Sequence, residues 1–204
     1  ILVLFGLFFY NNLFNKYNPR IGDNFLASNH VKIETSIGEI REIKLPDGTK
    51  VRLGAASSLS YSRTFEDVKH RNVTLNGEAY FDVARDTSRK FTVKTKFQKI
   101  EVLGTRFLVE GYGDDEKVKT SLFSGKIKIK PNTAKDVVLS PVQPSLVTHF
   151  AGRINTMSNS LSPSDRPSLD YINFEKETID QVMKKLSRWY NIKVRYDGPI
   201  GTSK

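Results

Sequence analysis

The sequence predicts a mainly β protein: a multi-stranded antiparallel sandwich or a solenoid-like β domain, followed by a partial α/β unit made of a strand, a helix and a strand. Three observations lead to this prediction. Apolar and polar residues alternate in short runs between residues 31 and 129, as they do in strands that bury one face. Residues that favour turns separate these runs. A convincing helical pattern appears only near the carboxyl end, over residues 179–190.

Each short run places alternate side chains on one face of a predicted strand. The runs cover residues 31–33, 43–45, 51–53, 59–61, 73–75, 79–83, 91–93, 100–102, 107–109, 118–122 and 127–129. Short strands at this spacing, without a helical pattern between them, are typical of a β sandwich or of stacked, solenoid-like β structure. The pattern does not choose between these two architectures.

The connections between the runs carry residues suited to tight turns. In the segment Leu-Pro-Asp-Gly-Thr at 45–49, Pro46 sets φ for the first corner of a turn, and Gly48 accepts the positive φ that closes a hairpin. Other turn signals are Asn76-Gly77, Gly104, the segment 111–115, and Ser124-Gly125. These connections predict hairpins rather than an active site.

The predicted helix has a start signal, an apolar stripe and a stop signal. Thr178 and Gln181 match a capping box, in which each side chain bonds the backbone of the other residue. Apolar residues follow at helical spacing, and Asn191 can end the helix. Runs at 171–174 and 192–196 read as strands, so residues 169–197 predict a strand-helix-strand unit. One such unit is too small to bury both of its faces.

Composition divides the chain into five segments. Residues 1–14 are apolar and are interpreted as the end of a transmembrane helix, with a buried strand or core helix as the alternative. Residues 15–30 form a polar linker. Residues 31–141 form the β domain, residues 142–168 are rich in Ser, Pro, Asn and Thr and are interpreted as a second linker, and residues 169–204 form the partial α/β domain.

Charge and cysteine content exclude several classes of function. The 204 residues include no cysteine, which excludes disulfides, thiolate zinc sites and cysteine nucleophiles within this sequence. The net charge is +10, but basic and acidic residues are interleaved along the chain. A protein that reads a nucleic-acid groove needs its positive charge clustered on one face. We therefore expect no nucleic-acid partner.

The sequence predicts no metal and no cofactor. The three histidines are far apart and have no metal-ligand spacing: His30, His70 and His149. The acidic residues at 114–116 could suggest calcium, but they are contiguous, whereas a calcium loop of the EF-hand type alternates its ligands. A hairpin turn is therefore the favoured interpretation of this segment.

Catalysis is also not expected, although two alternatives can be drawn from the residues. Glu78 and Asp82 lie four residues apart on one strand, so a glycosidase with paired carboxylates can be sketched. Solvent-facing acids are the commoner explanation. A non-catalytic envelope module that binds polysaccharide, or acts structurally, would be marked by a row of aromatic residues on one sheet face: Tyr61, Tyr80 and Phe81.

The order of several short motifs resembles a known family. Leu-Pro-Asp-Gly at 45–48 is followed by Leu-Asn-Gly-Glu-Ala-Tyr-Phe-Asp-Val at 75–83, Phe-Thr-Val at 91–93 and Val-Leu-Gly-Thr-Arg-Phe at 102–107. This order resembles the periplasmic domain of FecR-type anti-sigma regulators. The later pattern of Phe, Ile, Val, Leu, Trp-Tyr, Ile and Val over 174–194 is similar to the opening of the carboxy-terminal domain of the Bacteroidetes branch.

This resemblance implies a role in signalling across the envelope. It implies the periplasmic part of a single-pass inner-membrane protein, anchored through residues 1–14. Such a protein relays a signal from an outer-membrane TonB-dependent transporter, whose signalling domain is the expected partner, to an extracytoplasmic-function sigma factor. The sigma factor is expected to bind a cytoplasmic region that these residues do not include.

The candidate protein-binding residues lie at the end of the predicted helix and in the run that follows: Trp189, Tyr190, Ile192, Val194 and Tyr196. Aromatic side chains are enriched in binding hot spots, and an exposed strand edge can accept a strand from another chain. The alternative for Trp189 is that it only packs the helix on its own sheet.

Overall fold

A computed structural model describes residues 30–65, 70–132, 135–139, 145–150, 153–158, 172, 174, 177–195 and 197, with residues 145–158 described by backbone alone. The predicted transmembrane segment and nearly all of the first predicted linker lie outside these residues. Within the described part of the chain, no helix is both long and apolar enough to cross a membrane. The interpretation of residues 1–14 therefore stays a prediction.

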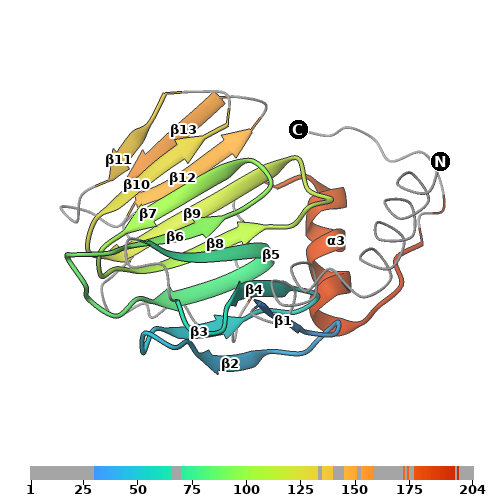
Figure 1. Cartoon of the computed structure of the whole chain (residues 1–204). Coiled ribbons are helices and arrows are strands. Elements are labelled where there is room, and N and C mark those ends of the chain that lie inside the picture. Colours follow the sequence, from blue (N-terminus) through green and yellow to red (C-terminus); the bar gives the residue numbers. More distant parts are fainter. Residues whose placement is uncertain are drawn as a thin grey trace, which may run out of the picture.

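Strands dominate the fold, as the sequence predicts, and one helix follows them in the described residues (Figure 1). The strands are β1 (His30–Glu34), β2 (Arg41–Lys44), β3 (Lys50–Leu53), β4 (Ser58–Ser62), β5 (His70–Asp82), β6 (Lys90–Lys94), β7 (Gln98–Val102), β8 (Arg106–Gly111), β9 (Lys117–Ser124), β10 (Ile127–Pro131), β11 (Val137–Leu139), β12 (Ser145–Phe150) and β13 (Arg153–Ser158). The helix is α3 (Ile179–Tyr190).

The long strand β5 belongs to two sheets. Its first half pairs with β4 and β6, and this sheet, called sheet 1, has the order β11-β10-β7-β6-β5-β4-β1. Its second half pairs with β3 and β8, and this sheet, called sheet 2, has the order β13-β12-β9-β8-β5-β3-β2. β5 passes between them at Gly77, which has φ of +120°, and a Cβ there would lie 2.2 Å from the Ser57 hydroxyl oxygen. Only glycine fits this crossing.

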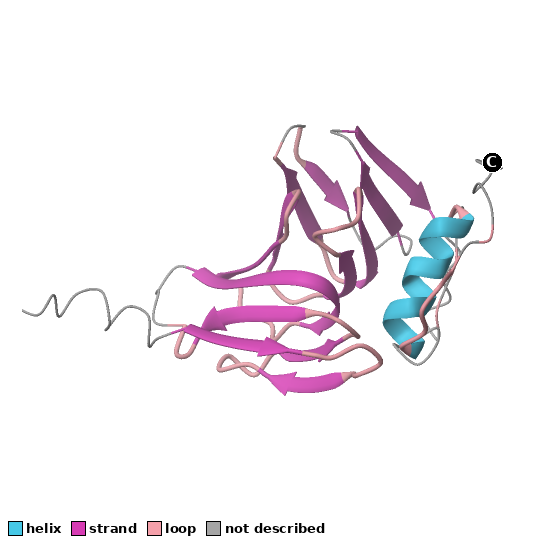
Figure 2. Ribbon diagram, turned by 90° about the vertical axis from the view of Figure 1, so that its right-hand side faces the viewer, coloured by secondary structure: helices cyan, strands magenta, loops and turns pink. Residues whose placement is uncertain are grey.

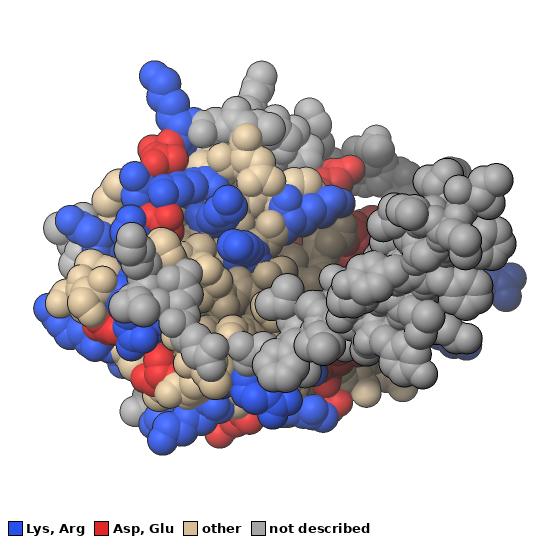
Figure 3. Space-filling model, viewed as in Figure 1, with Lys and Arg blue, Asp and Glu red and all other residues tan. Residues whose placement is uncertain are grey.

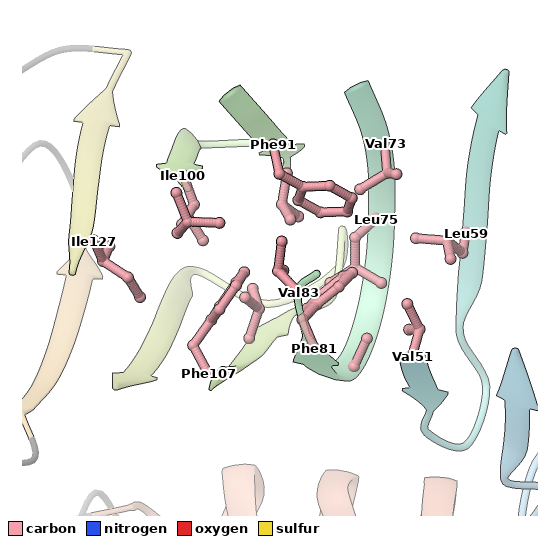
Figure 4. Close-up of a cluster of buried hydrophobic side chains, with 14 of the residues drawn as sticks. Val51, Leu59, Val73, Leu75, Phe81, Val83, Phe91, Ile100, Phe107 and Ile127 are labelled. Carbon is pink, nitrogen blue, oxygen red and sulfur yellow. The ribbon is translucent and has the colours of Figure 1, made fainter. Parts of the chain in front are cut away.

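The two sheets pack face to face, so the structure is a sandwich (Figure 2). Alternate residues of both sheets point inward, as the period of two requires. Phe81 of sheet 2 stacks on Phe107 with ring centroids 5.1 Å apart, and it contacts Phe91 of sheet 1 at 6.1 Å (Figure 4). All three rings are completely buried.

The pairing between β5 and β6 departs from the predicted antiparallel arrangement. These two strands are parallel, whereas every other described pair is antiparallel. β5 ends in sheet 2, and residues 83–89 return the chain to sheet 1, where β6 starts opposite His70. A crossing between sheets, rather than a hairpin, therefore sets the direction of β6.

The predicted turn at 45–49 is confirmed, and a buried ion pair anchors it. The Leu45 N–H donates to the Thr49 carbonyl at 2.8 Å, and Gly48 has φ of +85°. The Asp47 carboxylate accepts a hydrogen bond from the Arg71 guanidinium at 2.8 Å, and both side chains are almost completely buried. Arg71 also donates to two backbone carbonyls, so its charge is held by several partners.

The interpretation of residues 142–168 as a linker is wrong over 145–150 and 153–158. β12 pairs with β9 over its full length, and β13 pairs with β12. Serine, threonine and asparagine suggested a loop, but the open edge of β9 offers a row of unpaired backbone groups that an added strand satisfies. The sandwich therefore extends beyond residue 141, the boundary expected from composition.

The strands expected beside the helix are not found in the described residues. Residues 191–195 and the two described positions of the run 171–174, which are 172 and 174, are not in strands. A strand requires a hydrogen-bonded neighbour, and one strand-helix-strand unit supplies few. The predicted strand over 192–196 is therefore wrong for 192–195, while Tyr196 lies outside the described residues.

Candidate functional site: the contact between helix α3 and the sandwich

Helix α3 begins and ends where the sequence predicts. The Thr178 hydroxyl accepts a hydrogen bond from the Gln181 backbone N–H at 3.3 Å. The Gln181 side-chain oxygen accepts one from the Thr178 N–H, also at 3.3 Å, which completes the capping box. Asn191 ends the helix in the left-handed conformation.

The helix lies against the acidic turn between β8 and β9 (Figure 1). Arg188 donates to both carboxylate oxygens of Asp115, at 2.9 and 2.8 Å, and to Asp114 at 2.7 Å. Lys184 lies 3.0 Å from each of these two carboxylates. Partial burial opposes ionisation of Asp115, but the hydrogen bonds from Arg188 and Lys184 hold its pKa below the ordinary value.

The face of α3 that docks on the sandwich is its charged face. Gln181, Lys184, Lys185 and Arg188 recur at helical spacing, so they share one side of the helix. The apolar stripe, residues 179, 182, 183, 186 and 190, lies on the opposite side, where Ile179 is 55% exposed and Tyr190 is 63% exposed. No residue of the helix is buried. Ion pairs hold the charged face of the helix on the sandwich, while residues 182, 183 and 186 of the apolar stripe are half-buried.

Trp189 lies at the border between the two faces and contacts the sandwich. Its indole N–H donates to the Glu78 carboxylate at 3.4 Å. One residue earlier, the Arg188 carbonyl accepts a hydrogen bond from the Gly38 N–H at 2.9 Å. A Cβ at Gly38 would lie 3.2 Å from the Trp189 carbonyl oxygen, so the end of the helix sits tightly against the turn between β1 and β2.

Two carboxylates face each other beneath the helix. Glu78 of β5 lies directly opposite Glu110 of β8 in the register of sheet 2, and Glu78 is only 4% exposed. Burial raises the pKa of Glu78 to about 7, and the charge of Glu110 adds to the rise. Lys185 binds Glu110 at 2.6 Å and, with the Trp189 N–H, opposes this rise.

A second buried ion pair ties the residue before the helix cap to β9. Lys119 and Glu177 form a hydrogen-bonded ion pair, and both side chains are nearly buried. The other carboxylate oxygen of Glu177 is buried without a hydrogen-bond partner. Tyr112 completes the contact: its ring lies 3.8 Å beneath the Arg188 guanidinium, and its hydroxyl donates to the Ala55 carbonyl at 2.9 Å.

A cavity of about 370 Å³ lies between the helix and the acidic turn, lined mostly by these charged side chains of both signs. Four of its carboxylates are bound by lysine or arginine: Glu110, Asp114, Asp115 and Glu177. Among the residues that the structure describes, no group of three or more His, Cys, Asp or Glu could hold a metal ion. Partly exposed ion pairs of this kind are individually weak and sensitive to salt. The arrangement is chemically suited to holding and releasing a helix.

The structure does not bring the five predicted binding residues into one row. Trp189 is half-buried at Glu78, whereas Tyr190 and Ile192 are exposed and Val194 is half-buried. Tyr196 lies outside the described residues. The alternative for Trp189, packing the helix on its sheet, is correct only in part, because the apolar stripe points away from the sandwich.

The acidic turn has a role that the sequence patterns do not reveal. The segment 111–116 does form a connection between two strands, as favoured, but Asp114 and Asp115 also bind the helix. One signal was available: the cations of the helix, Lys184 and Arg188, lie on the side opposite the apolar stripe. Which acidic residues these cations bind depends on contacts between segments that lie 70 residues or more apart in the chain, as for Lys184 and Arg188 with Asp114.

Two alternatives from the sequence lose their structural basis. Glu78 is covered by the helix while Asp82 is exposed, so these carboxylates do not flank an open site. The aromatic row expected of a polysaccharide binder is also absent, because Tyr61 and Phe81 are buried in the core and Tyr80 packs against Phe123 at 6.2 Å.

Comparisons with known proteins identify similarities on both sides of the contact. The family described as "FecR protein" matches residues 31–128, and the family described as "FecR, C-terminal" matches residues 171–203. Two crystal structures of a "putative anti-sigma factor" from Parabacteroides distasonis ATCC 8503 match with a TM-score of 0.72 and 29% identity, covering 79% of this chain and 75% of that chain. Comparison with curated proteins finds no match.

Proposed function

Because the chain belongs to the FecR family of anti-sigma regulators, we propose that it is the periplasmic part of a single-pass inner-membrane regulator. In this proposal residues 1–14 end the membrane anchor. The regulator relays the state of an outer-membrane TonB-dependent transporter to an extracytoplasmic-function sigma factor, which binds a cytoplasmic region not included in these residues. The similarity to a "putative anti-sigma factor" at 29% identity supports this role.

The observation that carries the proposal is the way in which helix α3 is held. The two segments that match the family meet at the ion pairs of Lys184, Lys185 and Arg188 with the acidic residues of β8 and the turn after it. A relay requires a contact that a binding event can change. Exposed and partly exposed ion pairs can be exchanged for other contacts at low cost in free energy.

The exposed side of the carboxyl-terminal segment is the proposed docking site for the signalling domain of the transporter. Tyr190 and Ile192 are exposed large side chains two residues apart in sequence, and Phe174 is exposed before the helix. Apolar and aromatic side chains of this kind supply most of the energy of protein interfaces. Trp189, Val194 and Tyr196 remain proposed members of this site.

We propose that the protein acts by binding, without catalysis of its own. The carboxylates that come closest to an acid-base pair, Glu78 and Glu110, lie beneath Lys185 and the indole of Trp189. A substrate could reach them only after the helix had left. A polysaccharide-binding role has no comparable support, since two of its three marker aromatics are in the core.

The test is a binding titration between the full chain and purified signalling domains of TonB-dependent transporters from the same organism. We expect one of these domains to bind, and we expect the double substitution Tyr190→Ala with Ile192→Ala to weaken that binding at least tenfold, as removal of two interface anchors does. The matched control is Val138→Ala on β11, which removes an exposed aliphatic side chain on the edge of sheet 1. Equal affinity of the double variant and the control variant would contradict the assignment of this site.

A further inference from the structure

The outer face of sheet 1 carries a row of lysines in register. Lys99 of β7 lies directly opposite Lys94 of β6 on one side and Lys130 of β10 on the other. Side chains opposite each other in a sheet have Cβ atoms roughly 5 Å apart, and like charges in such positions repel. The same row continues across Thr74 and Ser60. These two residues are uncharged, so they do not offset the positive charge of the lysines.

Acidic residues neutralise little of this row. Lys130 binds Glu101 at 2.6 Å, and Lys90 lies 3.5 Å from the same carboxylate. Within the described part of the chain, Lys94 and Lys99 form no ion pair, and both are exposed. The Glu101 carboxylate therefore serves two cations, while Lys94 and Lys99 have no carboxylate partner among the described residues.

The outer face of sheet 2 is built differently. There the register places Asp82 between Lys50 and Arg106. Its neighbouring row places Glu42 opposite Arg52, at 3.5 Å between the charged groups. In the row of Asp82, Lys44 also lies opposite Lys50, so sheet 2 has an excess of positive charge as well, but acidic residues stand among its cations. The row on sheet 1 differs because all of its charged members are lysines.

Aliphatic side chains are exposed among the cations of sheet 1. A cavity of about 470 Å³ beside β7 has a floor that includes Val102 and Leu103, and Leu103 is 42% exposed. Its charged lining residues are four cations, Arg85, Lys90, Lys126 and Lys128, and one acid, Glu101, and Lys128 is paired with Asp136 at 2.8 Å. On the neighbouring edge strand β11, Val138 is 55% exposed and lies opposite Lys128. Basic side chains also outnumber acidic ones on the face seen in Figure 3.

We propose that the outer face of sheet 1 binds the anionic headgroups of a phospholipid bilayer. Lysines supply the electrostatic attraction, and Leu103 and Val138 reach the boundary between headgroups and acyl chains. The proposal rests on the proposed membrane anchor: residues 15–29 can span at most about 50 Å, and they lead into β1, the edge strand of this same sheet. A tether of this length brings the lysine row within reach of the bilayer surface.

The test compares the partitioning of the full chain into vesicles of two compositions at limiting lipid. Vesicles of phosphatidylcholine alone report on the apolar amino-terminal segment. Vesicles that also contain phosphatidylglycerol report in addition on the basic face. We expect stronger partitioning with phosphatidylglycerol, and we expect added salt to remove this difference. The triple variant K94Q/K99Q/K130Q should lower the difference on the order of a hundredfold, at about a fivefold loss for each lysine.

The matched control, K44Q/K50Q/R106Q, removes the same number of positive charges from the outer face of sheet 2. It should keep the dependence on phosphatidylglycerol. Equal losses in the two variants, or no effect of phosphatidylglycerol on the wild type, would overturn the proposal and leave the lysine row free for an acidic protein. Failure of the wild type to bind phosphatidylcholine vesicles would instead contradict the membrane anchor of the proposed function. Circular dichroism of each variant verifies that it is folded.

Discussion

Replacing Glu78 by glutamine should stabilise the protein at alkaline pH and leave it unchanged at acidic pH. Glutamine keeps the shape of the side chain and an oxygen that can accept the Trp189 indole N–H. It removes the ability to ionise. The substitution therefore isolates the cost of carrying a negative charge beneath the helix, opposite Glu110.

The expected magnitude follows from the pKa of Glu78. Burial and Glu110 raise this pKa from the ordinary 4.5 to about 7. Between these values the folded protein holds a proton that the unfolded chain has released, so the free energy of unfolding falls as pH rises through this window. Above about pH 7 this loss of unfolding free energy is complete. A pKa rise of this size corresponds to a loss of about 3 kcal/mol.

Urea unfolding of the full chain at about pH 4 and about pH 8.5 measures the effect. At the lower pH both forms carry a neutral side chain at position 78, and we expect equal free energies of unfolding. At the higher pH we expect Glu78→Gln to be more stable by up to about 3 kcal/mol. The control is Glu42→Gln, on the same face of sheet 2 but 81% exposed, with an expected change of about 0.5 kcal/mol or less.

The reasoning would be refuted if Glu78→Gln were as stable as the wild type at both pH values, or less stable at the higher one. The first result would mean that Glu78 ionises freely in the folded state. The second would mean that its carboxylate is a net favourable partner of Lys185 and Arg188, which lower its pKa.

Three further substitutions test other parts of the structure. Asp47→Asn leaves the buried guanidinium of Arg71 without its carboxylate and should cost about 3–5 kcal/mol in urea unfolding; a loss below about 1 kcal/mol would show that the backbone carbonyls suffice. Arg188→Ala removes the ion pairs to the acidic turn and should speed amide hydrogen exchange in α3 roughly tenfold, with β5 unaffected; unchanged protection of α3 would contradict an ionic attachment. Gly77→Ala places a methyl group against Ser57 at positive φ and should destabilise by more than about 2 kcal/mol, which thermal unfolding would detect; an unchanged midpoint would show that β5 can cross between the sheets without glycine.

Sequence patterns predicted the features whose causes lie within a few residues. The turn at 45–49 and the capping box of Thr178 and Gln181 depend on hydrogen bonds between near neighbours, so their residues identify them directly. The alternation of apolar side chains between residues 31 and 129 likewise predicted inward-pointing residues, including Phe81 and Phe107.

The incorrect predictions concern segments whose secondary structure depends on a partner far away in the chain. The polar composition of residues 145–150 and 153–158 suggests a linker, yet they are strands because β12 pairs with the edge of β9 and β13 pairs with β12. The run after Asn191 has the alternation of a strand, but residues 191–195 are not in one in the described structure. Alternation shows that a segment can be a strand, while pairing decides whether it is.

By itself, the sequence determined that the chain is mainly β, where its tight turns lie, where helix α3 starts and stops, and which family the protein resembles. Only the tertiary structure decided that the sheets form a sandwich through β5, that Glu78 faces Glu110 in register, and that α3 docks by its charged side. The physical reason is the range of the interactions. Turns and caps are bonded locally, whereas burial, register and ion pairing depend on residues that only the fold brings together.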